Sequence, residues 1–189
     1  MEKLEDHIYV VDNFLSHEEC DRMIAKIEKR GYKAAKVNMR GRQVLMTNVR
    51  NNLRVMYKDE TYAESLWEKI KAHVPQQIGY NHAFGLNEMF RFYKYEIGHR
   101  FKMHRDGSYR RNETEASQYS FLIYLNDDFA GGETVFRSGT IIRPKKGSAL
   151  LFLHGLLHEG AMLRGGIKYV LRTDIMYKYI PKIEGSWKT

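Results

Sequence analysis

The chain has 189 residues, of which 43% are hydrophobic and 29% charged, with a formal net charge of +8. This length suits one domain with a sizeable core, and the apolar fraction is normal for a soluble globular protein. Its apolar runs fall short of the roughly 20 residues that span a bilayer, and one cysteine, Cys20, excludes an internal disulfide. We therefore expect a cytoplasmic protein without a membrane partner. The charge fits either a plain soluble surface or attraction to an anionic partner such as nucleic acid.

The N-terminal region, residues 1–80, predicts one short strand and two helices. Residues 8–11 read Ile-Tyr-Val-Val, which is typical of a strand. Ser16 and Glu19 have the spacing of a capping box at the start of a helix. Apolar residues at helical spacing predict a second helix from about Glu60 to His73. We expect this region to be a helical support for the remainder of the chain.

From Asn87 onward the pattern changes to short strand-like segments separated by turn signals. The predicted strands are Met89–Tyr95, Phe101–His104, Gln118–Leu125, Thr134–Phe136, Thr140–Arg143, Ala149–Leu153 and Tyr169–Tyr177. Many short strands at close spacing indicate an antiparallel sandwich or barrel. We therefore predict a mainly β, α+β chain with N-terminal helices and a jelly-roll (cupin-like) core at residues 87–178.

A His-x-Asp pair, His104 and Asp106, follows one predicted strand. The pair is weak by itself, because His17 and Glu19 form a similar match by chance. Residues two apart share one face of a strand but point to nearly opposite sides of a helix. The pair at the strand end can therefore share a metal ion, whereas the pair in the predicted helix cannot easily do so.

A third ligand must come from another part of the chain, and His154 and His158 are the candidates. Two histidines and one carboxylate form a facial triad that leaves metal positions open for other ligands, as in non-heme Fe(II) oxygenases. A zinc hydrolase motif is absent, because Glu159 follows the second histidine instead of the first.

Two cations, Lys168 and Arg172, lie ten and fourteen residues beyond His158. On a strand they share one face, where a buried cation needs an anionic partner. The distal carboxylate of a 2-oxo acid would be such a partner, although solvated surface charges remain an alternative.

Four runs of sequence occur in a characteristic order. They are Arg91–Gly98 followed by Phe101–Gly107; Tyr124-Leu125-Asn126 followed by Gly131–Phe136; Pro144–Phe152; and His158-Glu159-Gly160 followed by Gly166 and Lys168. Across about residues 88–178 they resemble the prolyl 4-hydroxylase-like branch of the Fe(II)- and 2-oxoglutarate-dependent oxygenases. The resemblance implies a double-stranded β-helix, the cosubstrates 2-oxoglutarate and O₂, and ascorbate as reductant.

The resemblance also implies a role for individual residues. His104, Asp106 and His158 would bind Fe(II), with His158 favoured over His154 by its distance from Gly166 and Lys168. For 2-oxoglutarate, the implied residues are Lys168 at the distal carboxylate, Tyr124 as a hydrogen-bond partner of the same group, and Tyr95 in the pocket wall. Arg91 and Tyr93 are candidates for the substrate side.

Arg172 departs from the family pattern, because collagen-type members carry a small or neutral residue there. It therefore shares the anchoring of 2-oxoglutarate with Lys168, replaces it, or contacts a substrate other than a peptidyl proline. The predicted function is hydroxylation of an unactivated C–H, with an amino-acid side chain in a protein or peptide as the favoured substrate. The alternatives are the same chemistry on a nucleic acid or small metabolite, and a non-catalytic jelly-roll binding module or sensor.

Overall fold

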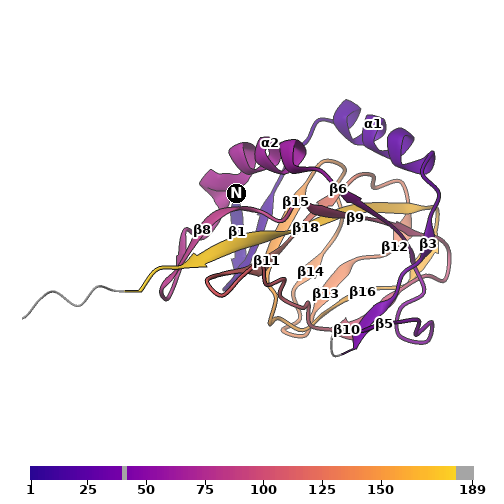
Figure 1. The fold of residues 1–189 in the computed structure, drawn as a ribbon. Helices are drawn as coiled ribbons and strands as arrows, with labels where there is room; N and C mark the ends of the chain where they lie inside the picture. Colours follow the sequence, from indigo (N-terminus) through magenta and orange to yellow (C-terminus); the bar gives the residue numbers. More distant parts are fainter. Residues whose placement is uncertain (40–41, 182–189) are drawn as a thin grey trace, which may run out of the picture.

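The larger of two β-layers forms the centre of the fold (Figure 1). The structure, a computed structural model, describes residues 1–39 and 42–181. All strands of this ten-stranded sheet pair antiparallel. Their order is β1 (Glu2–Glu5), β2 (Ile8–Val11), β15 (Ala149–Leu153), β11 (Glu115–Tyr124), β18 (Lys168–Tyr179), β9 (Met89–Tyr95), β6 (Leu53–Lys58) and β3 (Lys33–Ala34); β8 (Asn81–Leu86) also pairs with β18 and carries β7 (Gln77–Ile78).

The second layer is a four-stranded sheet in the order β10 (Phe101–His104), β16 (His158–Gly160), β13 (Thr134–Phe136) and β14 (Ile141–Ile142). Two further pairs are β12 (Ala130–Gly131) with β17 (Leu163–Gly165), and β4 (Val37–Met39) with β5 (Arg42–Val44). Buried side chains of both layers, such as Phe136, Ile142, Phe152 and Val170, meet in one cluster between them. The two antiparallel layers form the predicted jelly roll.

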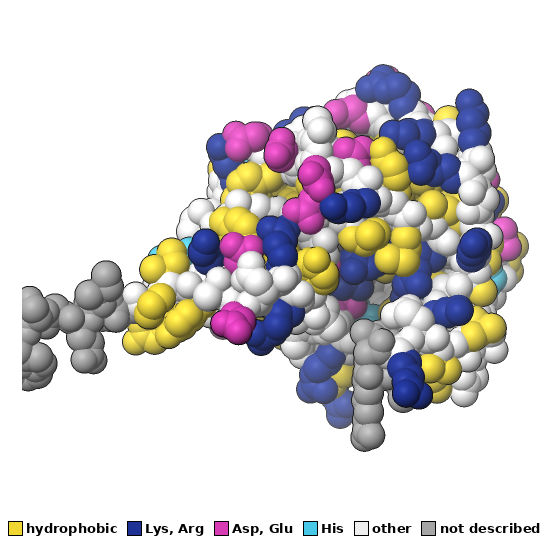
Figure 2. All heavy atoms as spheres, in the orientation of Figure 1, with side chains coloured by type: hydrophobic (Ala, Val, Ile, Leu, Met, Phe, Trp, Pro, Cys, Tyr) yellow, Lys and Arg dark blue, Asp and Glu magenta, His cyan; other side chains and the backbone are white. Residues whose placement is uncertain are grey.

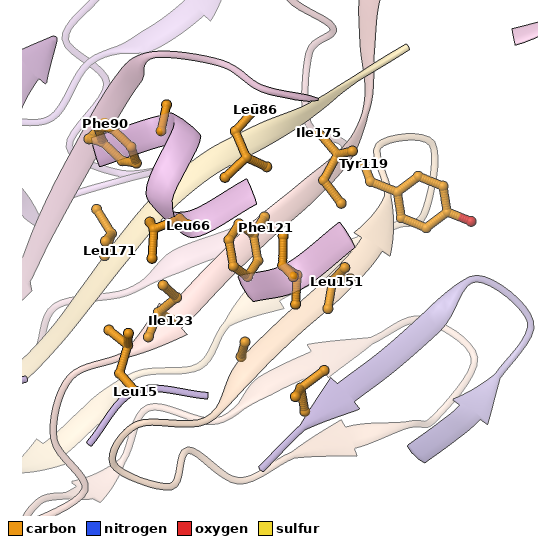
Figure 3. Close-up of a cluster of buried hydrophobic side chains, with 14 of the residues drawn as sticks. Leu15, Leu66, Leu86, Phe90, Tyr119, Phe121, Ile123, Leu151, Leu171 and Ile175 are labelled. Atoms are coloured by element: carbon orange, nitrogen blue, oxygen red, sulfur yellow. The ribbon is translucent and has the colours of Figure 1, made fainter. Parts of the chain in front are cut away.

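Two α-helices of the described chain cover the outer face of the larger sheet (Figure 1). The first, α1 (His17–Glu28), begins with the predicted capping box between Ser16 and Glu19. The second, α2 (Glu60–Ile70), continues as the 3₁₀-helix η1 (Lys71–His73). Apolar residues of the helices pack on alternate residues of the strands (Figure 3), as amphipathic elements must. Among the described residues, no helix is long and apolar enough to cross a membrane.

The N-terminal region is less helical than expected. It contains the two helices, but it also supplies β2 to one side of the larger sheet and β6 and β3 to the other. In β6, Leu53–Lys58, a run of only three hydrophobic residues lies between Arg54 and Lys58, so the apolar signal is short and easily missed. Its strand form depends on antiparallel pairing with β9, which is distant in sequence. The region therefore builds part of the core sheet as well as supporting it.

Candidate metal and cosubstrate site

Two neighbouring strands of the smaller sheet place the candidate histidines side by side. His104 ends β10 and His158 begins β16, and the two residues are directly paired across the strands. Asp106 lies two residues beyond β10, where its backbone N–H donates to the carbonyl of His154 at 3.1 Å. Asp106 Oδ1 is 3.6 Å from His104 Nε2, and its Oδ2 is 3.7 Å from His158 Nε2. The three predicted ligands are thus brought together.

Both histidines present the same ring nitrogen to this centre. Nδ1 of His104 lies 2.8 Å from the carbonyl of Lys102, and Nδ1 of His158 lies 3.0 Å from that of Leu156. A backbone carbonyl can only accept, so each Nδ1 carries the proton and each Nε2 is left with a lone pair. Burial lowers the pKa of His158 to about 4, which keeps this imidazole neutral. The pair is therefore ready to bind a cation.

Asp106 is held in its charged form by its surroundings. Burial opposes the charge, but Arg172 and then the two histidines keep the pKa of the carboxyl well below its usual value. Arg172 Nη1 donates to Oδ1 at 2.7 Å, and the Ser120 hydroxyl donates to Oδ2. The carboxylate is consequently fixed in orientation from two sides.

His154 has a different position from the other two histidines. Its Nε2 and Nδ1 lie 3.0 Å from the hydroxyls of Ser117 and Ser120, respectively. Since the Ser120 proton goes to Asp106, His154 Nδ1 must donate to Ser120 and Nε2 must accept from Ser117. Burial lowers the pKa of His154, in agreement with a neutral ring. Both of its nitrogens are thus engaged, and it supports Asp106 through Ser120.

The triad opens into a cavity that also contains Lys168 and Arg172. Its wall is formed by Tyr93, Tyr95, Phe101, Leu122, Thr134, Gly160 and Val170. Both cations therefore face inward on β18, as the strand pattern predicted. Four residues along a strand place their Cα atoms about 13 Å apart, so the cations lie toward different parts of this cavity.

Lys168 is a buried cation with no carboxylate within 4.0 Å among the described residues. Its Nζ donates to the carbonyl of Gly132 and lies 5.3 Å from the ring centres of both Tyr95 and Tyr124. Burial lowers its pKa to about 7, although Glu133 opposes the shift. An anion in the cavity would remove this cost of burial.

The two predicted cosubstrate tyrosines differ in their exposure to the cavity. Tyr95 lines it. Tyr124 packs beside Lys168, but its hydroxyl is paired with Thr134 Oγ1 at 2.7 Å. Thr134, which the sequence prediction did not single out, is the member of this pair that lines the cavity. Its position in the Gly131–Phe136 run was the available signal.

Arg172 joins the metal-side carboxylate to a second buried acid. Besides Asp106, its guanidinium binds Asp174 Oδ1 through Nη2 at 3.0 Å. The other oxygen of Asp174 accepts from Arg91 Nη1, also at 3.0 Å. The substrate-side candidate Arg91 is therefore committed to Asp174, while Tyr93 lines the cavity itself. This network identifies Asp174, Ser120 and Ser117 as further site residues, which no sequence motif had indicated.

The donor set fits the groups that the sequence suggested. Two neutral imidazoles and a carboxylate, with room beside them, suit Fe(II) in an open-sided site. The buried ammonium of Lys168 suits the distal carboxylate of 2-oxoglutarate. Fe(II) would be held by His104, Asp106 and His158, and the keto acid would lie between the metal and Lys168.

Residues 90–173 match the 2OG-Fe(II) oxygenase superfamily. The chain is 30% identical to probable prolyl 4-hydroxylase 11 of Arabidopsis thaliana over 169 residues, which cover 78% of this chain and 56% of that protein. It is 25% identical to probable prolyl 4-hydroxylase 8 of the same plant, covering 58% of that protein. The chain thus spans somewhat more than half the length of these curated relatives.

Solved structures share the fold. A prolyl hydroxylase from Trichoplax adhaerens, in complex with a hypoxia inducible factor peptide fragment, superposes with a TM-score of 0.72 at 17% identity, covering 89% of this chain and 83% of that one. The viral collagen prolyl hydroxylase of Paramecium Bursaria Chlorella virus-1 gives a TM-score of 0.63 at 20% identity, covering 91% and 96%. The chain is thus similar over residues 90–173 to the 2OG-Fe(II) oxygenase superfamily, and it shares its fold with these two prolyl hydroxylases.

Proposed function

We propose that this protein is a 2-oxoglutarate-dependent dioxygenase that hydroxylates an unactivated C–H bond. The observation that carries the proposal is that one cavity contains both a candidate metal site and a buried cation. At one place His104, Asp106 and His158 converge, and at another lies the buried ammonium of Lys168. A binding module has no need for an open-sided metal triad beside an unpaired buried cation.

Bound Fe(II), together with 2-oxoglutarate and O₂, supplies the oxidising chemistry, in which the keto acid is converted to succinate and CO₂. The protein's own residues bind and orient. Ser120 and Arg172 fix the Asp106 carboxylate, and Lys168 holds the cosubstrate at its far end. The rings of Tyr95 and Phe101 form part of the cavity wall.

The substrate that we favour is an amino-acid side chain in a protein or peptide. The names of the relatives support this choice, because they are prolyl hydroxylases and one is bound to a peptide. The net charge of +8 is compatible with a nucleic acid as the alternative substrate. However, on the face of the molecule drawn in Figure 2, Lys and Arg side chains are scattered and acidic side chains lie among them. A nucleic-acid footprint is instead a continuous basic patch or stripe.

The test is turnover of the cosubstrate. Folded protein supplied with Fe(II), O₂ and ascorbate should convert 2-oxoglutarate to succinate slowly even without substrate. Under anaerobic conditions, Fe(II) and 2-oxoglutarate together should give a weak visible charge-transfer band. If metal-loaded, folded protein gives neither succinate nor the band, the dioxygenase proposal is wrong and the non-catalytic alternative gains support. If succinate or the band does appear, an untargeted search for +16 Da products in a cell extract would identify the substrate.

A further inference from the structure

A group of guanidinium side chains surrounds Tyr93 on the wall of the cavity. Arg54 on β6 is paired with Tyr93 across the strands. Arg91 lies on the same face two residues earlier, with Arg172 directly opposite it on β18. Arg50 approaches from the segment before β6, with its Cζ 4.5 Å from the centre of the Tyr93 ring. Four cations thus lie around Tyr93, and of these Arg172 itself lines the cavity.

The charges of this group are not balanced within the described chain. Arg91 and Arg172 share the carboxylates Asp106 and Asp174. Arg50 and Arg54 form no ion pair with any described acid, since Arg54 binds the neutral Gln43 and Arg50 Nε binds the neutral Asn52. If Asp106 binds a metal, even less negative charge is left for the guanidiniums.

The lack of hydrogen-bond partners points to the same place. Among described residues, three buried side-chain atoms have none, and two of them are Arg50 Nη2 and Arg172 Nε. Arg50 is only 4% exposed, and a buried guanidinium nitrogen that lacks a hydrogen-bond partner is costly. Its Cζ also lies 4.4 Å from the Phe101 ring, which stacks on the ring of His104. Both rings that cover Arg50 line the cavity.

The positive charge of this group acts on the phenol of Tyr93. Burial alone would raise the pKa of its phenol, but Arg50, then Arg172 and Arg91, lower it to about 8. The pKa of Arg54 is lowered by burial and by its three cationic neighbours, against the opposing effect of Tyr93. Negative charge is therefore stabilised at this wall of the cavity.

We propose that Arg50 and Arg54, with Arg172 Nε and Tyr93, form a subsite for a carboxylate carried by the substrate. The inference rests on the proposed function, since it places an acidic residue of a peptide next to the side chain that is oxidised. The planar fork of a guanidinium matches a carboxylate. Because the Tyr93 and Phe101 rings cover Arg50, the proposal includes rotation of one of these rings when the ligand binds, a side-chain change of a kind common at binding sites.

The recess favours a peptide carboxylate over a phosphate of a nucleic acid. A carboxylate at the end of an aspartate or glutamate side chain can enter a narrow cavity, whereas a backbone phosphate is flanked on both sides by sugars. The distal carboxylate of 2-oxoglutarate is an equally poor occupant, because Lys168 supplies a separate cation for it about 13 Å along β18 from Arg172.

The experiment measures peptide binding without turnover. A pool of terminally blocked random hexapeptides is equilibrated with protein loaded with Mn(II) and 2-oxoglutarate, and separately with metal-free protein. Bound peptides are identified by mass spectrometry. We expect Asp or Glu to be enriched at one fixed position relative to the oxidisable residue. Replacing the enriched Asp by Asn, or the enriched Glu by Gln, in the best peptide should weaken binding of that peptide roughly 10- to 100-fold.

Variants assign this preference to the subsite. Arg50→Met should remove the distinction between the acidic and the amide peptide, Arg50→Lys should keep part of it, and Arg54→Met should reduce it. Arg100→Met is the matched control, because it removes an exposed cation next to Phe101 and should keep the preference. Arg54 is half-buried, so its variant remains informative if Arg50→Met does not fold.

Several results would overturn the subsite. The first is that the peptides bound to protein loaded with Mn(II) and 2-oxoglutarate are not enriched in Asp or Glu; this result leaves the proposed function intact. The second is a large loss of 2-oxoglutarate affinity in Arg50→Met. The third is that a single-stranded oligonucleotide competes more strongly than the acidic peptide. If N-acetyl-aspartate binds as tightly as the peptide, the carboxylate subsite stands but a small acid is its source. Acidic peptides that bind a chain unable to bind metal would contradict only the dioxygenase proposal.

Discussion

The two faces of β9 and β18 differ completely, although they are built from alternate residues of the same strands. On the outer face, Phe90 and Phe92 of β9 and Leu171 and Ile175 of β18 pack beneath the helices. The residues between them, among them Arg91, Arg172 and Asp174, point to the cavity side and form an ionic network. A period of two is enough to place a hydrophobic core and a polar site one residue apart.

The difference teaches that the two faces contribute to different properties. Burial of the outer side chains removes apolar surface from water and stabilises the fold. The inner network is weak support for stability, because desolvation of each charge offsets most of the attraction. Instead, the inner network fixes the orientation of Asp106 and places cationic side chains on the cavity side of the sheet. Substitutions on the two faces should therefore separate stability from ligand binding.

The largest effect on binding should follow from removing a triad member. His158→Ala deletes one of three ligands, so its loss of Fe(II) affinity should exceed the about 10- to 100-fold typical for an outer partner of a metal ligand. Anaerobic Fe(II) titration measures this. His154→Ala should retain most metal affinity but lower the stability, since the buried Ser117 hydroxyl loses its acceptor. The opposite result for the two variants would move the third ligand to His154.

The cluster of His104, Asp106 and His158 was predictable from sequence because it uses metal-binding residue types in a local pattern. His104 and Asp106 form a two-residue motif at a strand end, and His158 lies at a fixed distance from Lys168. The strand over residues 149–153 and the capping box at Ser16 were equally visible, since each depends on local periodicity or a local hydrogen bond. Local signals were therefore sufficient for the candidate ligands and for most core elements.

What sequence did not reveal depends on contacts between distant segments. Ser120 and Asp174 look like ordinary strand residues, and only antiparallel pairing of β11 with β18 places them opposite each other. The division of labour between Lys168 and Arg172 was open for the same reason. The structure pairs Arg172 with Asp106 and Asp174, partners that no spacing along the chain could indicate. Arg50 carried no motif and was missed altogether.

On the outer face, Phe121→Ala should have a large effect on stability alone. Phe121 is fully buried in the cluster shown in Figure 3, and truncation of such a ring costs about 3–5 kcal/mol of unfolding free energy. Urea unfolding followed by circular dichroism measures the loss. At a temperature where the variant remains folded, its Fe(II) and 2-oxoglutarate affinities should match the parent chain. A metal affinity that fell in step with stability would contradict the separation of the two faces.

On the inner face, Lys168→Met should weaken 2-oxoglutarate binding. Loss of a charge-assisted bond to a desolvated carboxylate costs about 2–4 kcal/mol, or on the order of 30- to 1,000-fold in affinity. The anaerobic visible band gives the dissociation constant. Because Met fills most of the space and the lowered pKa shows that burial disfavours the charge, stability should be unchanged or increased. A large loss only in Arg172→Met would transfer the anchoring role to Arg172.

The pH dependence of 2-oxoglutarate binding should sharpen the role of Lys168. In the ligand-free fold its pKa is lowered from 10.5 to about 7 by burial, so the folded state binds fewer protons than the unfolded state between these values. Stability of the ligand-free chain should therefore rise with pH across that window. A carboxylate ligand favours the charged amine, so 2-oxoglutarate affinity should fall above about pH 7, by at most about tenfold per unit. Lys168→Met should lack both trends.

The smallest effect should come from the edge of the outer layer. Ser16 accepts from the Glu19 backbone N–H, and the Glu19 carboxylate accepts from the Ser16 backbone N–H, so Ser16→Ala removes half of the capping box. The expected loss is about 1 kcal/mol of unfolding free energy.

Ser16→Asp is the matched control, because its carboxylate can accept the same bond near the positive end of the helix dipole and should restore the stability. Helix α1 packs only on the outer face, so neither variant should change 2-oxoglutarate affinity. A change in that affinity would mean that the outer layer positions the cavity residues, and the two faces would then be mechanically coupled through their shared strands.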